Sequence, residues 1–91
     1  MKPRHVAALA LVGWYLMVPP VESGGRVNFE APLSQWHRWG SYDTARECSV
    51  DESDLIDRGK RVREEHPQNE MTDMFTQAQC IASDDPRLKP N

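Results

Sequence analysis

An unbroken run of 13 uncharged residues extends from Val6 to Val18, directly after a short positive segment at residues 1–5. A positive segment followed by an apolar one of this length is typical of a secretory signal peptide. Pro19-Pro20 ends the stretch, and residues that a signal peptidase tolerates follow up to Ser23. This pattern predicts a cleavable signal peptide over residues 1–23.

The end of the same stretch also fits a β-strand of the mature fold. Trp14–Val18, WYLMV, is rich in β-prone residues and is followed by two prolines that would end a strand. In this interpretation residues 1–12 are the remnant of a leader, residues 13–88 form a single domain and residues 89–91 are a loose tail. A remnant of that length is too short for a complete leader, so the true start would lie upstream of Met1.

A second strand is predicted over Leu33–Gly40, where LSQWHRWG has the length of a strand and carries a tryptophan on each side. Alternation places His37 and Trp39 on one face and Trp36 on the other. Aromatic residues on both faces indicate a strand covered by a helix on one face and by a loop or the N-terminal segment on the other.

The next segment carries the signals of one long helix. Thr44 and Glu47 have the spacing of a capping box, which places the start of the helix at Thr44, and His66-Pro67 ends it. Mainly apolar residues share one helical face: Ala45, Cys48, Leu55, Ile56, Gly59 and Val62. Glu52 falls inside this face, which predicts a break or a loosened turn near Ser49–Ser53.

Charges on this helix are ordered with acids early and bases late, which suits the helix dipole. Two pairs, Asp54 with Arg58 and Asp57 with Arg61, have the four-residue spacing of helical ion pairs. The acidic residues do not follow the order of a calcium-binding loop, and we interpret them as a solvated helix face.

The last third of the chain predicts a short helix, a strand and a turn. Helical spacing of Met71, Met74, Phe75 and Ala78 predicts two turns after Asn69, with the Met and aromatic side chains filling the core. Gln79–Ser83 is expected to be a strand that carries Cys80, and Asp84–Pro86 a turn. The expected fold class is therefore α+β, a small antiparallel sheet of about three strands packed by one main helix.

The length and the cysteine content set further bounds. A chain of 91 residues forms at most one small domain, and such domains usually need a staple. In an exported protein Cys48 and Cys80 would pair and close a loop of about 33 residues, worth roughly 3.5 kcal/mol in the chain-entropy model. In a reducing cytosol they would remain two thiols, so the pairing depends on export.

The net charge excludes some partners. It is −3, from 11 basic and 14 acidic residues, and removal of residues 1–23 would leave 9 basic and 13 acidic residues, or −4. An acidic domain without a basic block lacks the electrostatic signature of a nucleic-acid binder. It also offers no polybasic patch to anionic lipid.

The sequence carries no catalytic or metal-binding signature. Its histidines and cysteines lack the spacings of common metal sites, and no serine lies in a glycine elbow. We therefore expect no enzymatic activity, no cofactor and no metal. Trp36, His37 and Trp39 are the candidate ligand-contacting residues, because indole rings can stack on a sugar or a peptide; the alternative is that the tryptophans fill the core.

Three stretches carry a resemblance to other proteins: WYLMVPP from Trp14, SYDTARECS from Ser41 and AQCIASDDPRL from Ala78. Together they resemble a group of short, uncharacterised bacterial exported proteins. The resemblance implies that the WYLM stretch follows a leader and belongs to the mature chain, and that Cys48 pairs with Cys80. No activity, cofactor or catalytic residue comes with it.

These observations leave three hypotheses for function. The first is a small exported binding or structural module, periplasmic, secreted or in the cell envelope, whose partner is an unknown protein or envelope component. The second keeps residues 6–21 as an uncleaved anchor in the inner membrane, so that the acidic domain is an accessory subunit docked on a larger complex. The third is a Trp-lined binder of carbohydrate or peptide.

Overall fold

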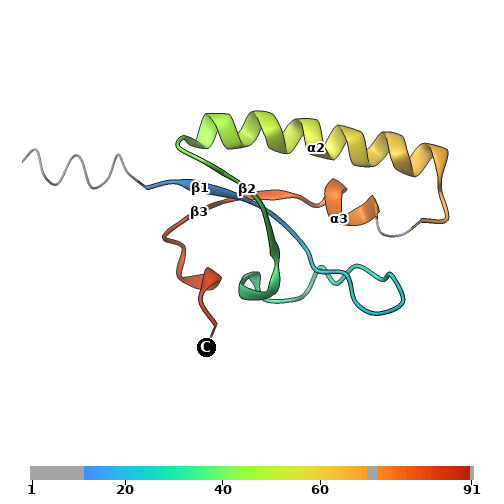
Figure 1. Ribbon diagram of the computed structural model, residues 1–91, viewed down its shortest axis with the longest axis horizontal. Coiled ribbons are helices and arrows are strands. Elements are labelled where there is room, and N and C mark those ends of the chain that lie inside the picture. The colour runs from blue at the N-terminus through green and yellow to red at the C-terminus, as the bar shows by residue number, and fades with distance from the viewer. Residues whose placement is uncertain (1–11, 70–71, 91) are drawn as a thin grey trace, which may run out of the picture.

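The computed structural model describes residues 12–69 and 72–90, which form a three-stranded antiparallel sheet packed against one main helix (Figure 1). The strands are β1 (Trp14–Val18), β2 (His37–Tyr42) and β3 (Gln79–Ala82); the α-helices are α2 (Ala45–Glu65) and α3 (Asp73–Thr76); and η1 (Leu33–Gln35) and η3 (Pro86–Leu88) are single 3-10 turns. The predicted α+β class and the predicted order of elements are confirmed.

β1 is the central strand, with β2 on one side and β3 on the other, both antiparallel to it. Its side chains Leu16 and Val18 are fully buried. The strand interpretation of WYLMV is thus confirmed, and a cut after Ser23 would remove the central strand of the sheet. Most of the predicted leader, residues 1–11, lies outside the described residues.

The two faces of the sheet are covered differently. α2 lies along one face (Figure 1), where Leu16, Val18, Cys48, Leu55 and Ala78 form the buried core. On the opposite face the 3-10 turns η1 and η3 lie beside each other. Side chains from both turns reach the sheet there, and Met17 of β1 is only 4% exposed. A helix on one face and loop segments on the other is the arrangement that the two-sided aromatic pattern predicts.

The second strand begins later than predicted. Leu33–Gln35 is a 3-10 turn that starts after Pro32, closed by hydrogen bonds from Gln35 N to Pro32 O (2.8 Å) and from Trp36 N to Leu33 O (3.1 Å). Proline fixes a backbone angle that suits the start of such a turn. The predicted strand over Leu33–Gly40 is therefore wrong for its first four residues, and β2 extends instead to Tyr42.

α2 begins as predicted and runs further without interruption than predicted. Thr44 is the N-cap: its Oγ1 accepts from Glu47 N at 3.1 Å, and its own N donates to Glu47 Oε1 at 3.2 Å. His66 is the C-cap, and its N–H donates to the carbonyl of Val62. The helix is continuous over Ala45–Glu65, so the predicted break near Ser49–Ser53 is wrong.

Glu52 has a partner that explains its place on the apolar face of α2. Its carboxylate accepts a hydrogen bond of 3.1 Å from the backbone N of Cys80. In an antiparallel ladder every second residue pair is hydrogen-bonded. Ser83 and Gly13 form a bonded pair, so Cys80, three residues earlier, is in a pair without these bonds, and its N–H points to the outer edge of β3. One turn earlier on the helix, Cys48 forms the disulfide with Cys80. The disulfide is confirmed, and α2 holds Cys80 at two points.

Replacing Glu52 by alanine is expected to lower the free energy of unfolding by about 1–2 kcal/mol, because the N–H of Cys80 loses a charged acceptor. Glu52→Gln keeps an oxygen acceptor and should lose clearly less. Urea unfolding of the two variants beside the wild type measures the difference. An alanine variant as stable as the wild type would mean that water satisfies this N–H equally well.

α3 packs closely on α2 because Gly59 has no side chain. A Cβ built at Gly59 would lie 2.9 Å from the Cβ of Phe75, and Arg63 at the end of α2 forms an ion pair of 2.7 Å with Asp73 of α3. α3 is one turn long where two were predicted. Met71, part of that prediction, lies outside the described residues.

The remaining predictions near α2 and β3 have mixed outcomes. The Asp54–Arg58 ion pair is present at 2.8 Å. No ion pair between Asp57 and Arg61 occurs in the part of the chain that the structure describes. The final strand and the turn after it lie where they were predicted, the strand one residue shorter.

Candidate binding surfaces

The structure separates the three predicted ligand-contacting residues. Trp36 lies on the face opposite α2, beside Tyr15 and Met17, and its indole N–H donates to the carbonyl of Ala31 at 2.8 Å. Trp39 lies on the α2 face and is 51% exposed. His37 is exposed at the start of β2. The two tryptophans therefore belong to different surfaces, as their alternation predicts.

A β-bulge decides what Trp39 faces. Leu16 pairs with Gly40 and Met17 pairs with Arg38, which leaves Trp39 as an extra residue on β2. Residues three apart on a regular strand lie on opposite faces, but the bulge brings both Trp39 and Tyr42 to the α2 face. There the two aromatic side chains approach the first half of the helix.

The result is a small cavity between β2 and α2, which we call the β2–α2 recess. It has a volume of about 80 Å³, and its lining is Leu16, Trp39, Tyr42, Asp51, Asp54, Leu55 and Arg58. The leucines come from the buried core. Aromatic side chains therefore line the β2 side of the recess, and carboxylates and a guanidinium line the helix side.

Packing holds the two aromatic rings of the recess in place. A Cβ at Gly40 would lie 2.6 Å from the hydroxyl oxygen of Tyr42, so only glycine lets the Tyr42 ring lie across this position of the strand. The Trp39 and Phe75 rings meet at 72° with their centroids 5.2 Å apart, the edge-to-face arrangement that aromatic pairs prefer. Trp39 is thus oriented although half of its surface faces solvent.

The charges of the recess are partly neutralised. Arg58 forms its ion pair with Asp54 at 2.8 Å, between two exposed side chains. Asp51 acts on Tyr42: burial of the phenol, followed by the hydrogen bond to Asp51 and its negative charge, raises the pKa of Tyr42 to about 12. Tyr42 is therefore a neutral hydrogen-bond donor at physiological pH. The recess keeps one net negative charge, on Asp51.

The pKa of Tyr42 gives the protein a pH dependence at alkaline pH. Between the unfolded value of 10.0 and the folded value of about 12, the folded state keeps a proton that the unfolded state releases. The free energy of unfolding should therefore fall as pH rises through this range, by at most about 1.4 kcal/mol per pH unit.

Tyr42→Phe is expected to remove this contribution. Urea unfolding of the wild type and the variant at about pH 9 and about pH 11 isolates it, because the other groups that titrate there are common to both proteins. The wild type should lose more stability between the two pH values than the variant. Equal losses would contradict the role of Tyr42.

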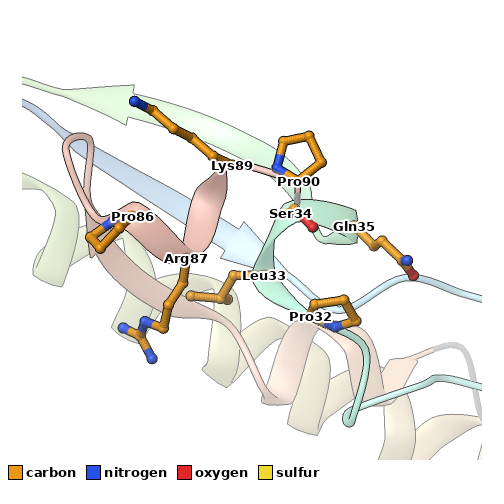
Figure 2. A pocket seen from close by; sticks show the side chains of 8 residues that line it. All are labelled: Pro32, Leu33, Ser34, Gln35, Pro86, Arg87, Lys89 and Pro90. Carbon is orange, nitrogen blue, oxygen red and sulfur yellow. The ribbon is translucent and has the colours of Figure 1, made fainter.

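A second hollow lies on the opposite face of the sheet, between η1 and η3 (Figure 2). Its volume is about 670 Å³, and its lining is Pro32, Leu33, Ser34, Gln35, Pro86, Arg87, Lys89 and Pro90. Figure 2 shows the side chain of Leu33 directed from η1 toward the segment that carries Arg87. This groove joins parts of the chain that are far apart in sequence.

The groove brings together little chemistry for its size. Arg87 is held at the rim by Asp85 through hydrogen bonds of 2.8 and 3.1 Å. The Arg87 guanidinium lowers the pKa of the Asp85 carboxyl, so the two charges offset each other. The rest of the lining is mainly proline and leucine, with Lys89 as the remaining cation.

Two further structural findings bear on function. Within residues 12–69 and 72–90, no three side chains of His, Cys, Asp or Glu lie close enough to hold a metal ion. None of the helices in this part of the chain is both long and apolar enough to cross a bilayer.

The recess contains functional candidates that the sequence pattern did not single out, namely Tyr42 and Asp51. Asp51 had been interpreted as part of a solvated face. The bulge that turns Tyr42 toward it lies beside Gly40, and a glycine inside a strand is a signal that could have indicated it. Compared with protein-family models, curated proteins and solved structures, the chain matches none.

Proposed function

We propose that this protein is a small, non-enzymatic binding module of an oxidising compartment, the bacterial periplasm or cell envelope. The observation that carries the proposal is the disulfide between Cys48 of the main helix and Cys80 of an edge strand. Structural disulfides form and persist in exported proteins and are rare in a reducing cytosol. The resemblance to short exported proteins supports the same compartment.

The exposed aromatic side chains favour binding as the role. Trp39 is 51% exposed in a recess with charged walls, and Phe29 is 48% exposed in the loop that leads to η1. Tryptophan and other aromatic residues are enriched where proteins bind partners.

The membrane-anchored accessory subunit is the competing proposal. It requires residues 6–21 to remain as a helical anchor, and five of those residues, Trp14–Val18, form the central strand here. An anchor would have to take them out of the sheet. The position of β1 in the sheet therefore opposes the anchor, independently of the disulfide.

Fractionation and thiol titration test the proposal together. The protein is expressed with an export signal placed before Gly13, and the soluble periplasmic and membrane fractions are compared. We expect soluble recovery with no titratable thiol until the protein is denatured and reduced. Two reactive thiols in the denatured, unreduced protein would contradict the oxidising compartment. If the full chain were recovered only in the membrane fraction, the anchored subunit would be favoured.

A further inference from the structure

We infer that the β2–α2 recess binds the ammonium group of a lysine side chain in a peptide segment of a partner protein. This inference rests on the proposed binding role and names the chemistry of one site. The site joins the exposed indole of Trp39 to the carboxylate of Asp51 across a cavity of about 80 Å³.

The size of the cavity matches the tip of an aliphatic amine. A water molecule occupies about 30 Å³ of liquid, so the recess has room for an ammonium group and one or two methylene groups. The ring of Trp39, which is 51% exposed, supplies the apolar contact for the methylene groups.

The walls of the recess suit a cation. An aromatic ring attracts a cation placed over its face, and a carboxylate accepts charge-assisted hydrogen bonds. In the described part of the chain, Arg58 pairs with Asp54, and no basic side chain forms an ion pair with Asp51. The Arg38 guanidinium lies 4.5 Å from the ring of Tyr15, on the opposite face. The Trp39–Asp51 pair is thus available to a cation from outside.

The surroundings of the recess favour a peptide over a free amine. Another hollow, of about 420 Å³, lies next to the recess along α2 and shares Tyr42 and Asp51 with it. Its other lining residues are Arg46, Glu47 and Val50. Val50 is 62% exposed. A residue next to the bound lysine can therefore contact Val50, while the negative net charge of the protein, −3, attracts a basic segment.

The backbone of β2 is not the docking element. The backbone groups of Trp14 and Leu16 form the hydrogen bonds of β1 to β2. The backbone groups of β2 that point away from the sheet therefore belong to Arg38 and Ser41, which the bulge places three residues apart. A regular strand needs a spacing of two, so a straight peptide cannot pair along this edge. Binding here depends on side chains, which makes single substitutions informative.

The test uses nuclear magnetic resonance of the tryptophan indole signals, with Trp39→Phe to assign the signal of Trp39. The probe is the peptide acetyl-Gly-Val-Lys-Gly-amide, and its matched control carries norleucine in place of lysine. We expect the lysine peptide to shift the Trp39 signal with a dissociation constant of about 1 mM, a free energy of roughly −4 kcal/mol, and to leave the Trp36 signal unchanged. The norleucine peptide should cause no saturable shift.

Two isosteric variants separate the site from general electrostatics. Asp51→Asn should weaken binding of the lysine peptide about fivefold, equivalent to roughly 1 kcal/mol, while its amide oxygen can still accept from Tyr42. Asp57→Asn makes the same charge change on an exposed position of the same helix and should weaken binding less than about twofold. An unchanged dispersed spectrum shows that each variant is folded.

Several results would overturn the inference. They are the absence of a saturable Trp39 shift up to about 20 mM peptide, equal binding of the norleucine peptide, and equal weakening by the two variants. Butylammonium that binds as tightly as the peptide would overturn the assignment to a peptide segment. The peptide experiments do not test the compartment of the protein or its thiol state. The inferred lysine site can therefore be contradicted while the proposed function stands, and the reverse is also true.

Discussion

A chain that begins at Gly24 will not fold, whereas a chain that begins at Gly13 will. β2 and β3 do not contact each other as neighbours in the sheet, because each pairs with β1. Removing residues up to Ser23 takes away the strand that joins them, together with the fully buried Leu16 and Val18.

The size of this loss decides the outcome. Burial of one aliphatic side chain is worth about 1.5–3 kcal/mol, and β1 contributes three buried ones, those of Leu16, Met17 and Val18. The hydrogen bonds of two ladders are lost with them. Small domains have a total stability of about 5–15 kcal/mol, so what remains cannot offset the cost of ordering the chain.

Far-ultraviolet circular dichroism and amide signal dispersion of the two truncated chains test this prediction, each with the disulfide formed. The chain from Gly13 is the control, since it lacks the predicted leader remnant but keeps β1. Dispersed signals from the chain that begins at Gly24 would contradict the central role of β1. In exported material, the same argument predicts a mature N-terminus near Gly13 rather than at Gly24.

Loss of the disulfide is the second large effect expected. The double variant Cys48→Ala with Cys80→Ala should lower the free energy of unfolding by at least roughly 3.5 kcal/mol, because the unfolded chain regains the entropy lost by closing a loop of about 33 residues. The two cysteines are 32 residues apart, and their Cα atoms lie 6.1 Å apart in the fold. Cys48 is also fully buried, so removal of its sulfur adds a loss of packing.

Urea unfolding of the double variant measures this loss, and the reduced wild type is the matched control because it keeps both sulfur atoms. The two should differ by less than either differs from the oxidised protein. A variant within about 1 kcal/mol of the oxidised wild type would contradict a large contribution of the disulfide to stability.

Local signals in the sequence predicted the elements well. The capping box of Thr44 needs only residues three positions apart, and the strand at Trp14 is marked by its own composition and by the prolines after it. The predictions that were wrong failed because they depended on contacts between distant parts of the chain. Glu52 was interpreted as a polar residue on an apolar face, and its acceptor role depends on Cys80, which is 28 residues away.

The candidate site was harder to predict for the same reason. Trp39 was identified from its type, but its neighbours in the recess come from a bulge that is set by pairing with Leu16 and Met17. Periodicity within β2 places Tyr42 on the wrong face relative to Trp39. Side chains become partners here through register, and register is a property of two strands together.

The position of β1 in the sheet also sets the time at which the protein can fold. It is the first strand of the described chain, and one of its two neighbours is the last strand, across a loop of roughly 60 residues. A chain that leaves the ribosome or crosses a membrane from its N-terminus cannot complete the sheet until Gln79–Ala82 has emerged. The disulfide cannot form earlier either, because Cys80 lies on that strand. Until synthesis or translocation is nearly complete, the chain lacks its central sheet and its disulfide, and an unfolded chain is the state that a secretion channel can pass.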